Sequence, residues 1–347
     1  MAETGTYAYV SHNKGREILV LRLDPASGAL TPVQQVAVTG HAMPMAVSPD
    51  RRFLFVALRS LPYSVASFAI DPLSGKLTHL ANAPLPDSMS YISTDRTGRY
   101  LLATAISDDR SKPRKALISV SSIGPNGFVQ PAHQIMRTGP KAHCILADPS
   151  NNYVLVALCD ADEIMRLVFD AATGMYSPNT LTPVRTKPHS GPRQFLFHPN
   201  YRFFYVLSEP DASVYAFRYD ASAGALTELQ TLSALPPDFG DKHPEGAGID
   251  ITPDGRFLYT SERSSNTLAA FKIDLASGIL SPVGHFPTED RPHGFSIDPH
   301  GRCLLAAGEN SSRMTSYAID GETGNLTKLK EYPLGKGPNC VKILNLP

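Results

Sequence analysis

A repeated strand–turn–strand pattern constrains the fold of this chain more than any other feature. Each copy has an apolar run, a tight turn rich in Pro, Asp and Gly, and a second apolar run, as expected for paired β-strands. Six copies lie at residues 45–56, 91–102, 145–156, 191–209, 249–259 and 295–305. A chain built from such copies is a tandem array of β-hairpins.

A second kind of turn separates these hairpins. It begins with Asp and ends with Gly, as in the segment from Asp24 to Gly28, and the glycine can adopt the positive φ that a tight hairpin needs. The seven turn glycines, of which Gly127 belongs to a degenerate copy, are 46 to 54 residues apart: Gly28, Gly75, Gly127, Gly174, Gly224, Gly278 and Gly324. Each interval holds four candidate strands.

Four strands in each repeat of about 40–50 residues are typical of a β-propeller blade. We therefore predict an all-β, seven-bladed propeller with four antiparallel strands per blade, in one domain over residues 1–347. A helical fold is disfavoured, because no apolar stripe at helical spacing continues for three turns and Pro interrupts the chain often. The predicted blades are 42–84, 88–133, 141–185, 191–233, 245–285, 291–331, and 337–347 together with 5–38.

The last of these blades uses both ends of the chain. The N-terminal segment supplies its second, third and fourth strands, and the C-terminal segment supplies its first strand. This pairing closes the ring and removes two open sheet edges.

The overall charge and the cysteines exclude several classes of function. Lys and Arg total 32, as do Asp and Glu, so the net charge gives no case for nucleic acid or an anionic membrane as a partner. No run of about 18 apolar residues and no secretory signal pattern is visible. The four cysteines form no C-x-x-C pair: Cys144, Cys159, Cys303 and Cys340. Reduced thiols, a cytoplasmic location and a monomer or small homo-oligomer are expected.

In a propeller, the loop before each first strand and the loop after each second strand open on one face around the central channel. Concave places of this kind bind small ligands. The polar and flanking residues expected on this face are Pro44, Met89, Lys141, His143, Arg193, Glu245, His293, Asn339, Arg59, Asp108, Asp160, Glu209, Glu262, Arg263, Glu309, Asn310, His12 and Asn13. His198 and Asp254 are expected in turns on the opposite face. Two longer loops, 107–115 and 236–244, could overhang the site.

Three of these residues suggest binding or hydrolysis of a small polar, anionic molecule. Neutral His143 can take a proton from water near neutral pH. Arg193 offers a planar cation for a carboxylate, a phosphate or a developing oxyanion. Glu209 could orient His143, hold substrate hydroxyls or relay a proton. Each of the three could equally be a solvated residue at the end of a loop.

Five more residues of this face are candidates for substrate binding: Lys141, Glu245, Arg263, His293 and Asn339. The chain has no G-x-S-x-G elbow, no phosphate-binding P-loop and no His/Cys cluster with zinc spacing. We therefore expect no cofactor and no metal. A metal held by Glu245, Glu262 and Glu309 from separate blades is conceivable, but no motif supports it.

These motifs resemble those of the bacterial propeller-type 6-phosphogluconolactonase family. The resemblance runs from Tyr7 to Leu344 and is most specific at 191–199 with Glu209, at 251–259 and at 291–308. It implies hydrolysis of a sugar lactone without a cofactor. The residues that it implicates are a His that opens the third blade, the Arg of Gly-Pro-Arg and a Glu after the next second strand.

In this sequence these three are His143, Arg193 and Glu209. If the substrate carries phosphate, Arg263 or the basic loop 110–115 is expected to meet it. The chain departs from the family pattern at Gln194, where a His is usual, at His293, where an Arg is frequent, and at 243–249. All three places lie where the substrate is selected.

The preferred hypothesis is hydrolysis of 6-phosphogluconolactone, a reaction of the pentose phosphate pathway. One alternative is a lactonase or lactonising enzyme that acts on a plain aldonolactone or a muconate-type acid. The other is a propeller without catalytic activity that binds other proteins, since the fold alone does not decide function. An exposed apolar patch on the rim would favour such a binding protein, whereas a polar pocket over the channel would favour an enzyme.

Overall fold

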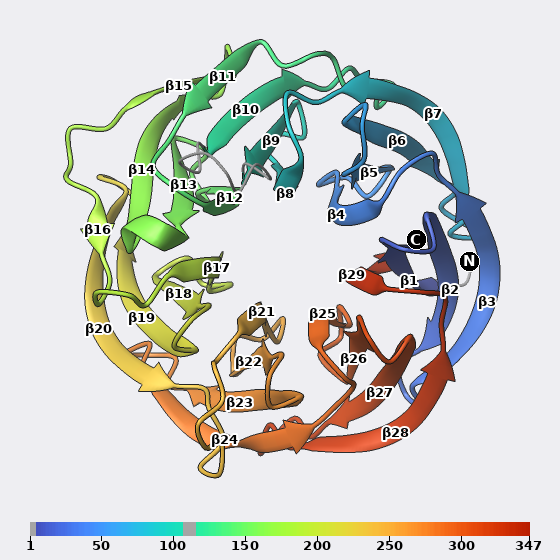
Figure 1. Ribbon diagram of the computed structural model, residues 1–347, viewed down its shortest axis with the longest axis vertical. Helices are drawn as coiled ribbons and strands as arrows, with labels where there is room; N and C mark the ends of the chain where they lie inside the picture. The colour runs from blue at the N-terminus through green and yellow to red at the C-terminus, as the bar shows by residue number, and fades with distance from the viewer. Residues whose placement is uncertain (1–4, 107–115) are drawn as a thin grey trace.

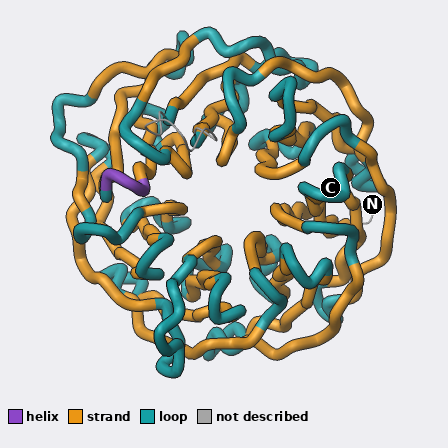
Figure 2. Tube along the Cα trace, viewed as in Figure 1, coloured by secondary structure: helices purple, strands orange, loops and turns teal. Residues whose placement is uncertain are grey.

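The computed structural model describes residues 5–106 and 116–347, and these form seven antiparallel sheets arranged in a ring (Figure 1). The first strand of each sheet lies at the central channel and the fourth lies at the rim. Within the described ranges, the only helical element is a 3-10 turn at Cys159–Ala161 (Figure 2). The predicted fold class is confirmed.

The strands follow the predicted blades closely. Blade 1 has β4 (Ala42–Val47), β5 (Phe53–Leu58), β6 (Ser64–Ile70) and β7 (Leu77–Pro84); blade 2 has β8 (Met89–Thr94), β9 (Tyr100–Ala105), β10 (Leu117–Ser122) and β11 (Gln134–Arg137). Blade 3 has β12 (Ala142–Ala147), β13 (Tyr153–Leu158), β14 (Glu163–Asp170), β15 (Met175–Pro178) and the short β16 (Val184–Arg185). Blade 4 has β17 (Pro192–Phe197), β18 (Phe203–Ser208), β19 (Ser213–Asp220) and β20 (Ala225–Ser233).

The remaining blades complete the ring. Blade 5 has β21 (Gly246–Ile251), β22 (Phe257–Glu262), β23 (Thr267–Ile273) and β24 (Leu280–Pro287). Blade 6 has β25 (Pro292–Ile297), β26 (Cys303–Gly308), β27 (Arg313–Ile319) and β28 (Leu326–Pro333). Blade 7 joins β29 (Pro338–Leu346) to β1 (Gly5–His12), β2 (Glu17–Asp24) and β3 (Ala29–Ala37).

Blade 2 departs most from its predicted boundaries, and the outer strands of blades 5 and 6 also run past their predicted ends, to Pro287 and Pro333. Blade 2 was expected to end at residue 133, but its outer strand β11 covers Gln134–Arg137. The chain first makes an isolated bridge between Ile123 and Val129, which lengthens the connection that follows β10. Blade 3 differs in a smaller way, because its outer edge is shared by β15 and β16, which both pair with β14.

Blade 7 confirms the predicted closure of the ring by the two ends of the chain. The strand β29 pairs with β1 in antiparallel register from Gly5 opposite Leu346 to His12 opposite Pro338. Blade 1 is tied to this seam, since the Arg51 guanidinium donates a hydrogen bond of 2.6 Å to the carbonyl oxygen of Asn345.

The turn glycines also join neighbouring blades. Gly278 in blade 5 has φ of +79°, and a Cβ atom at this position would meet the Phe203 ring at the start of the second strand in blade 4. The same glycine–aromatic contact recurs between most successive blades: Gly75 with Tyr7, Gly127 with Phe53, Gly174 with Tyr100, Gly224 with Tyr153 and Gly324 with Phe257. The repeated glycine therefore serves both the turn and the interface between blades.

We expect Gly278→Ala to lower the free energy of unfolding by about 2 kcal/mol, because it combines an unfavourable φ with overpacking against a fully buried ring. Gly321→Ala is the matched control, since no atom lies within 4 Å of its added Cβ. Denaturant unfolding of both variants tests this contact, and equal midpoints would contradict it.

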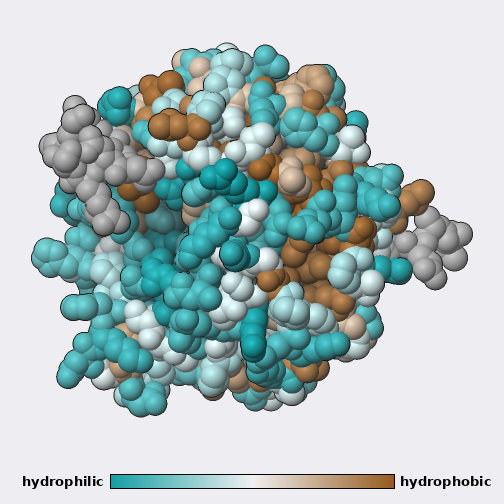
Figure 3. All heavy atoms as spheres, turned by 45° about the vertical axis from the view of Figure 1, so that its right-hand side comes forward, coloured by the Kyte–Doolittle hydropathy of each residue, from teal (hydrophilic) through white to brown (hydrophobic). Residues whose placement is uncertain are grey.

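The structure bears on three expectations from the sequence: the state of the cysteines, the lack of a membrane-spanning helix and the nature of the surface. All four cysteines are free; three are buried and Cys340 is half-buried. None of the helical segments within the described ranges is long and apolar enough to span a membrane. On the face drawn in Figure 3 the surface is largely hydrophilic, and the most extensive apolar area lies toward the side of the ring that carries blades 7 and 1. The cytoplasmic location and the oligomeric state stay predictions.

Candidate functional site

A β-bulge at the start of each first strand supplies the side chains of the candidate site. In blade 3, Ala142 pairs with Leu158 and Cys144 with Ala157, so His143 is the extra residue. The same irregularity makes Arg193 the extra residue in blade 4 and His293 the extra residue in blade 6. Bulges commonly redirect side chains next to functional sites.

All seven first strands carry this irregularity at the same end. The remaining bulges leave Ser90 unpaired in blade 2 and Asn339 in blade 7, and place residues 43–44 opposite one residue in blade 1 and 247–248 opposite one in blade 5. We call these positions the bulge ring. All of its members except Ala247 line a cavity of about 250 Å³ in the central channel, and the cavity also contacts Gln194.

Arg193 is the most deeply buried charge of the bulge ring, with 1% of its surface exposed. Its Nη1 donates a hydrogen bond to the Ala247 carbonyl oxygen, and its Nη2 lies 3.2 Å from His293 Nε2. Burial, together with the positive charge of Arg263, lowers the pKa of Arg193 to about 10. The guanidinium therefore stays charged near neutral pH and is held in one orientation.

His293 supports Arg193 from blade 6. Its Nδ1 lies 3.3 Å from the Asn339 carbonyl oxygen, which can only accept, so Nδ1 carries the hydrogen and Nε2 accepts from Arg193. Burial and the charge of Arg193 lower the pKa of His293 well below its ordinary value. The contacts identify His293 as a neutral residue that positions Arg193, in addition to lining the cavity.

Glu209 follows the second strand of blade 4 and sits between three cations. Its Oε1 lies 2.6 Å from Arg263 Nη2 and 3.6 Å from Arg193 Nε, and its Oε2 forms an ion pair with Lys141. Burial alone would raise the pKa of Glu209, but the charges of Arg193 and Lys141 outweigh it and hold the pKa well below the ordinary value. Glu209 is therefore an ionised anchor for these cations.

His143 lies beside this charge cluster in blade 3, with 8% of its surface exposed. Burial, followed by the positive charge of Arg193, lowers its pKa well below the ordinary value, so the imidazole is neutral near neutral pH. Its Nδ1 has no hydrogen-bond partner among the described residues. No hydrogen bond among the described residues therefore supports the expected orientation of His143 by Glu209.

Two more buried polar atoms of the bulge ring lack a hydrogen-bond partner within the described part of the chain. These are Asn339 Nδ2 and Arg193 Nε. A buried polar group without a partner is costly, and such groups occur where a ligand or a water completes the hydrogen bonds. All three residues line the channel cavity, and Arg193 Nε faces its ion-pair partner Glu209 at 3.6 Å, so His143 Nδ1 and Asn339 Nδ2 are the candidate ligand contacts.

The mouth of the channel carries a chain of alternating charges. Arg263 contacts Glu209 and also Glu245, whose Oε2 lies 2.6 Å from Arg291 Nη1. Arg291 Nε in turn lies 3.7 Å from Glu309, which accepts a hydrogen bond from Asn13. Arg263 and Glu245 are thus brought to the site as predicted, but each already has a partner of opposite charge.

Other predicted residues of this face have structural roles. Glu262 is buried and its carboxylate accepts hydrogen bonds from the backbone N–H groups of Glu245 and Ser265, which fixes the turn after β22.

Among the described residues no group of three His, Cys, Asp or Glu could hold a metal ion. Asp108 and the basic loop 110–115 lie outside the described residues. His198 lies in a turn as expected, and its Nε2 forms a hydrogen bond of 3.0 Å with the Gly255 carbonyl oxygen.

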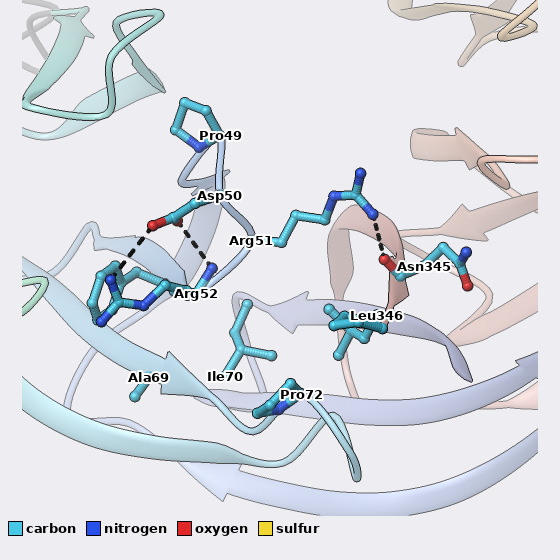
Figure 4. Close-up of a pocket in the computed structure, with 11 residues that line it drawn as sticks. Pro49, Asp50, Arg51, Arg52, Ala69, Ile70, Pro72, Asn345 and Leu346 are labelled. Carbon is cyan, nitrogen blue, oxygen red and sulfur yellow. Dashed lines mark hydrogen bonds and ion pairs between the residues drawn. The ribbon is translucent and has the colours of Figure 1, made fainter. Parts of the chain in front are cut away.

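A larger cavity of about 720 Å³ lies at the seam between blades 7 and 1, at the opposite ends of the strands (Figure 4). Its floor is apolar, with Ile70, Pro72 and Leu346, and the hydrogen bond from Arg51 to Asn345 crosses it. The charged residues Asp50 and Arg52 pair with each other at 3.8 Å. This groove is the kind of surface that a binding propeller would use, and its lining among the described residues includes no His, Ser or Cys.

The sequence of this chain matches a known protein family over almost its whole length. The family, described as lactonase with a seven-bladed β-propeller, matches residues 3–343, and the chain belongs to this family.

The relatives specify the family further. A 6-phosphogluconolactonase of Pectobacterium carotovorum is 39% identical over 287 residues, which are 83% of this chain and 83% of that protein. One of Serratia proteamaculans is 38% identical over the same share of each chain. Among solved structures, the periplasmic gluconolactonase of Pseudomonas aeruginosa superposes with a TM-score of 0.90 at 25% identity, covering 99% of this chain and 100% of that one.

Proposed function

We propose that this protein hydrolyses a sugar lactone in the channel cavity, and that 6-phosphogluconolactone is its preferred substrate. The observation that carries the proposal is the set of three buried side chains, His143, Arg193 and Asn339, that line one cavity, with His143 Nδ1 and Asn339 Nδ2 left without a partner among the described residues. The names of the relatives support the same substrate class.

In the proposed reaction, neutral His143 removes a proton from a water molecule, whose oxygen attacks the lactone carbonyl carbon. The carbonyl oxygen becomes an oxyanion, and the charged guanidinium of Arg193 stabilises it. The intermediate then collapses, the bond between the carbonyl carbon and the ring oxygen breaks, and the ring oxygen receives the proton from the His143 imidazolium. The product is the open-chain acid.

The remaining residues position these two groups. Glu209 keeps Arg193, Lys141 and Arg263 in place and can accept hydrogen bonds from substrate hydroxyls. Asn339 Nδ2 is a free donor for a substrate oxygen. His293 holds Arg193 without competing for the oxyanion.

The direct test incubates the purified protein with a panel of lactones. The hydrolysis rate is measured as proton release at constant pH, and the spontaneous rate is subtracted. Hydrolysis of 6-phosphogluconolactone above that of glucono-δ-lactone, with a preference that salt weakens, supports the proposal. Equal or greater activity on glucono-δ-lactone favours a plain aldonolactone, as the likeness to the Pseudomonas gluconolactonase would suggest. No hydrolysis of any lactone would refute both.

The pH dependence of kcat/KM tests the role of His143. The base must be neutral to act, and its pKa in this site lies well below 6.5, the ordinary value. Activity should therefore persist as the pH falls through 6.5, and the acid limb should have its inflection below that value. An inflection at or above pH 6.5, measured with the spontaneous rate subtracted at each pH, would contradict a desolvated His143 as the base.

A further inference from the structure

A second set of residues forms the floor of the channel cavity. Three positions along the first strands from the bulge ring, the side chains that line the cavity are Leu146, Leu196, Ser296 and Lys342, with Asp250 at the corresponding level of blade 5. Three residues of β-strand span about 10 Å. The cavity therefore has an upper level with His143, Arg193 and Asn339, and a lower level with Lys342.

Lys342 differs from the other cations around this site. Lys141, Arg193, Arg263 and Arg291 all have a carboxylate within ion-pair distance. The half-buried Lys342 has no ion pair and no hydrogen bond in the described part of the chain, although it lines the cavity.

The carboxylate of the floor level does not neutralise Lys342. Asp250 interacts with Lys342 only at longer range, and its two oxygens accept hydrogen bonds of 2.9 Å and 3.0 Å from the backbone N–H groups of Ile251 and Ile297. Lys342 stands in blade 7 and Asp250 in blade 5, with Ser296 of blade 6 between them. An unpaired ammonium in a partly desolvated cavity is a preformed site for an anion.

We infer that Lys342 binds the phosphate monoester of the substrate at the floor of the channel, while the lactone ring lies at the level of the bulge ring. This inference rests on the proposed function and specifies its substrate class. Lysine binds phosphate as a compact point charge, and Lys342 lines the cavity on the same side of the ring as the serine hydroxyl of Ser296 in blade 6. The cations at the mouth do not replace Lys342, because each is already paired with Glu209 or Glu245.

The test compares Lys342→Met and Lys342→Arg with Lys272→Met, which removes an exposed lysine from β23 as a matched control. The measured quantity is the ratio of kcat/KM for 6-phosphogluconolactone to that for glucono-δ-lactone. We expect Lys342→Met to lower this ratio roughly 10- to 100-fold, the usual range for losing one charge-assisted hydrogen bond, and Lys342→Arg to retain most of it. A ratio that stays at the wild-type value in Lys342→Met would overturn the inference.

A binding measurement separates this inference from the proposed catalysis. Calorimetric titration with 6-phosphogluconate, gluconate and inorganic phosphate should show that the wild type binds the phosphorylated acid more tightly than gluconate, and that Lys342→Met loses this difference. Thermal unfolding of each variant checks that it is folded. If the wild type hydrolyses neither lactone, the proposed function fails while the titration still tests Lys342. Equal binding of 6-phosphogluconate by the wild type and Lys342→Met refutes the phosphate site.

Discussion

Replacing His143 with alanine is expected to lower kcat for lactone hydrolysis roughly 10²- to 10⁴-fold, the usual contribution of a positioned general base. The imidazole is neutral because burial and the charge of Arg193 lower its pKa, so most molecules hold the base in its active form at neutral pH. His143→Gln should lose as much activity, because it keeps a polar side chain of similar size but cannot accept a proton from water. Initial rates under saturating lactone measure the effect.

The matched control for this change is His300→Ala. His300 is exposed in the turn between β25 and β26, at the opposite end of these strands from the bulge ring. Its loss should leave both kcat and the unfolding midpoint near the wild-type values. Normal turnover by His143→Ala would show that another group activates the water and would remove the proposed mechanism.

The second large effect is expected at Arg193. Arg193→Met should lower kcat roughly 10²- to 10³-fold, as does the loss of a single oxyanion donor in hydrolases. It should also lower the free energy of unfolding by about 1–3 kcal/mol, because His293 Nε2 and the Ala247 carbonyl oxygen lose their donor in a buried place. Initial rates at saturating lactone measure the effect on kcat, and denaturant unfolding of the same preparation measures the effect on stability.

Two further measurements distinguish chemistry from stability at Arg193. Arg193→Lys keeps the charge but cannot contact Ala247 and His293 at once, so it should recover part of the stability and little of kcat. Guanidinium at concentrations below those that unfold the protein should partly restore the rate of Arg193→Ala. A wild-type kcat for Arg193→Met at saturating lactone would contradict the proposed oxyanion stabilisation.

The fold could be predicted from the sequence because its signals are local and repeated. Gly278 illustrates this: the turn requires a residue with positive φ, and a glycine with positive φ recurs at the same turn in every blade. The ring closure could also be predicted, since the two ends supplied complementary parts of one blade. The end of blade 2 could not, because a single bridge between Ile123 and Val129 shifts the outer strand without a clear mark in the sequence.

The candidate site could be predicted only in outline. Because His143, Arg193 and Glu209 lie at hairpin ends, they could be predicted to share one face. No pattern in the sequence indicated the bulges that turn His143 and Arg193 into the channel. Lys342 was not among the sequence candidates, although it lies in a first strand. A charged residue within the apolar run from Val341 to Leu344 was the signal that could have identified it.

Local sequence patterns specify the seven repeats, their four strands and the group of polar residues at the channel face. These follow from side-chain alternation and turn chemistry, which act over a few residues. Which charged side chains meet depends on the folded ring. Glu209 is bound by cations from blades 3, 4 and 5, Arg193 is held by blades 5 and 6, and Lys342 is left unpaired among the described residues. Charge pairing depends on distances between separate blades, and these distances exist only after the ring has closed.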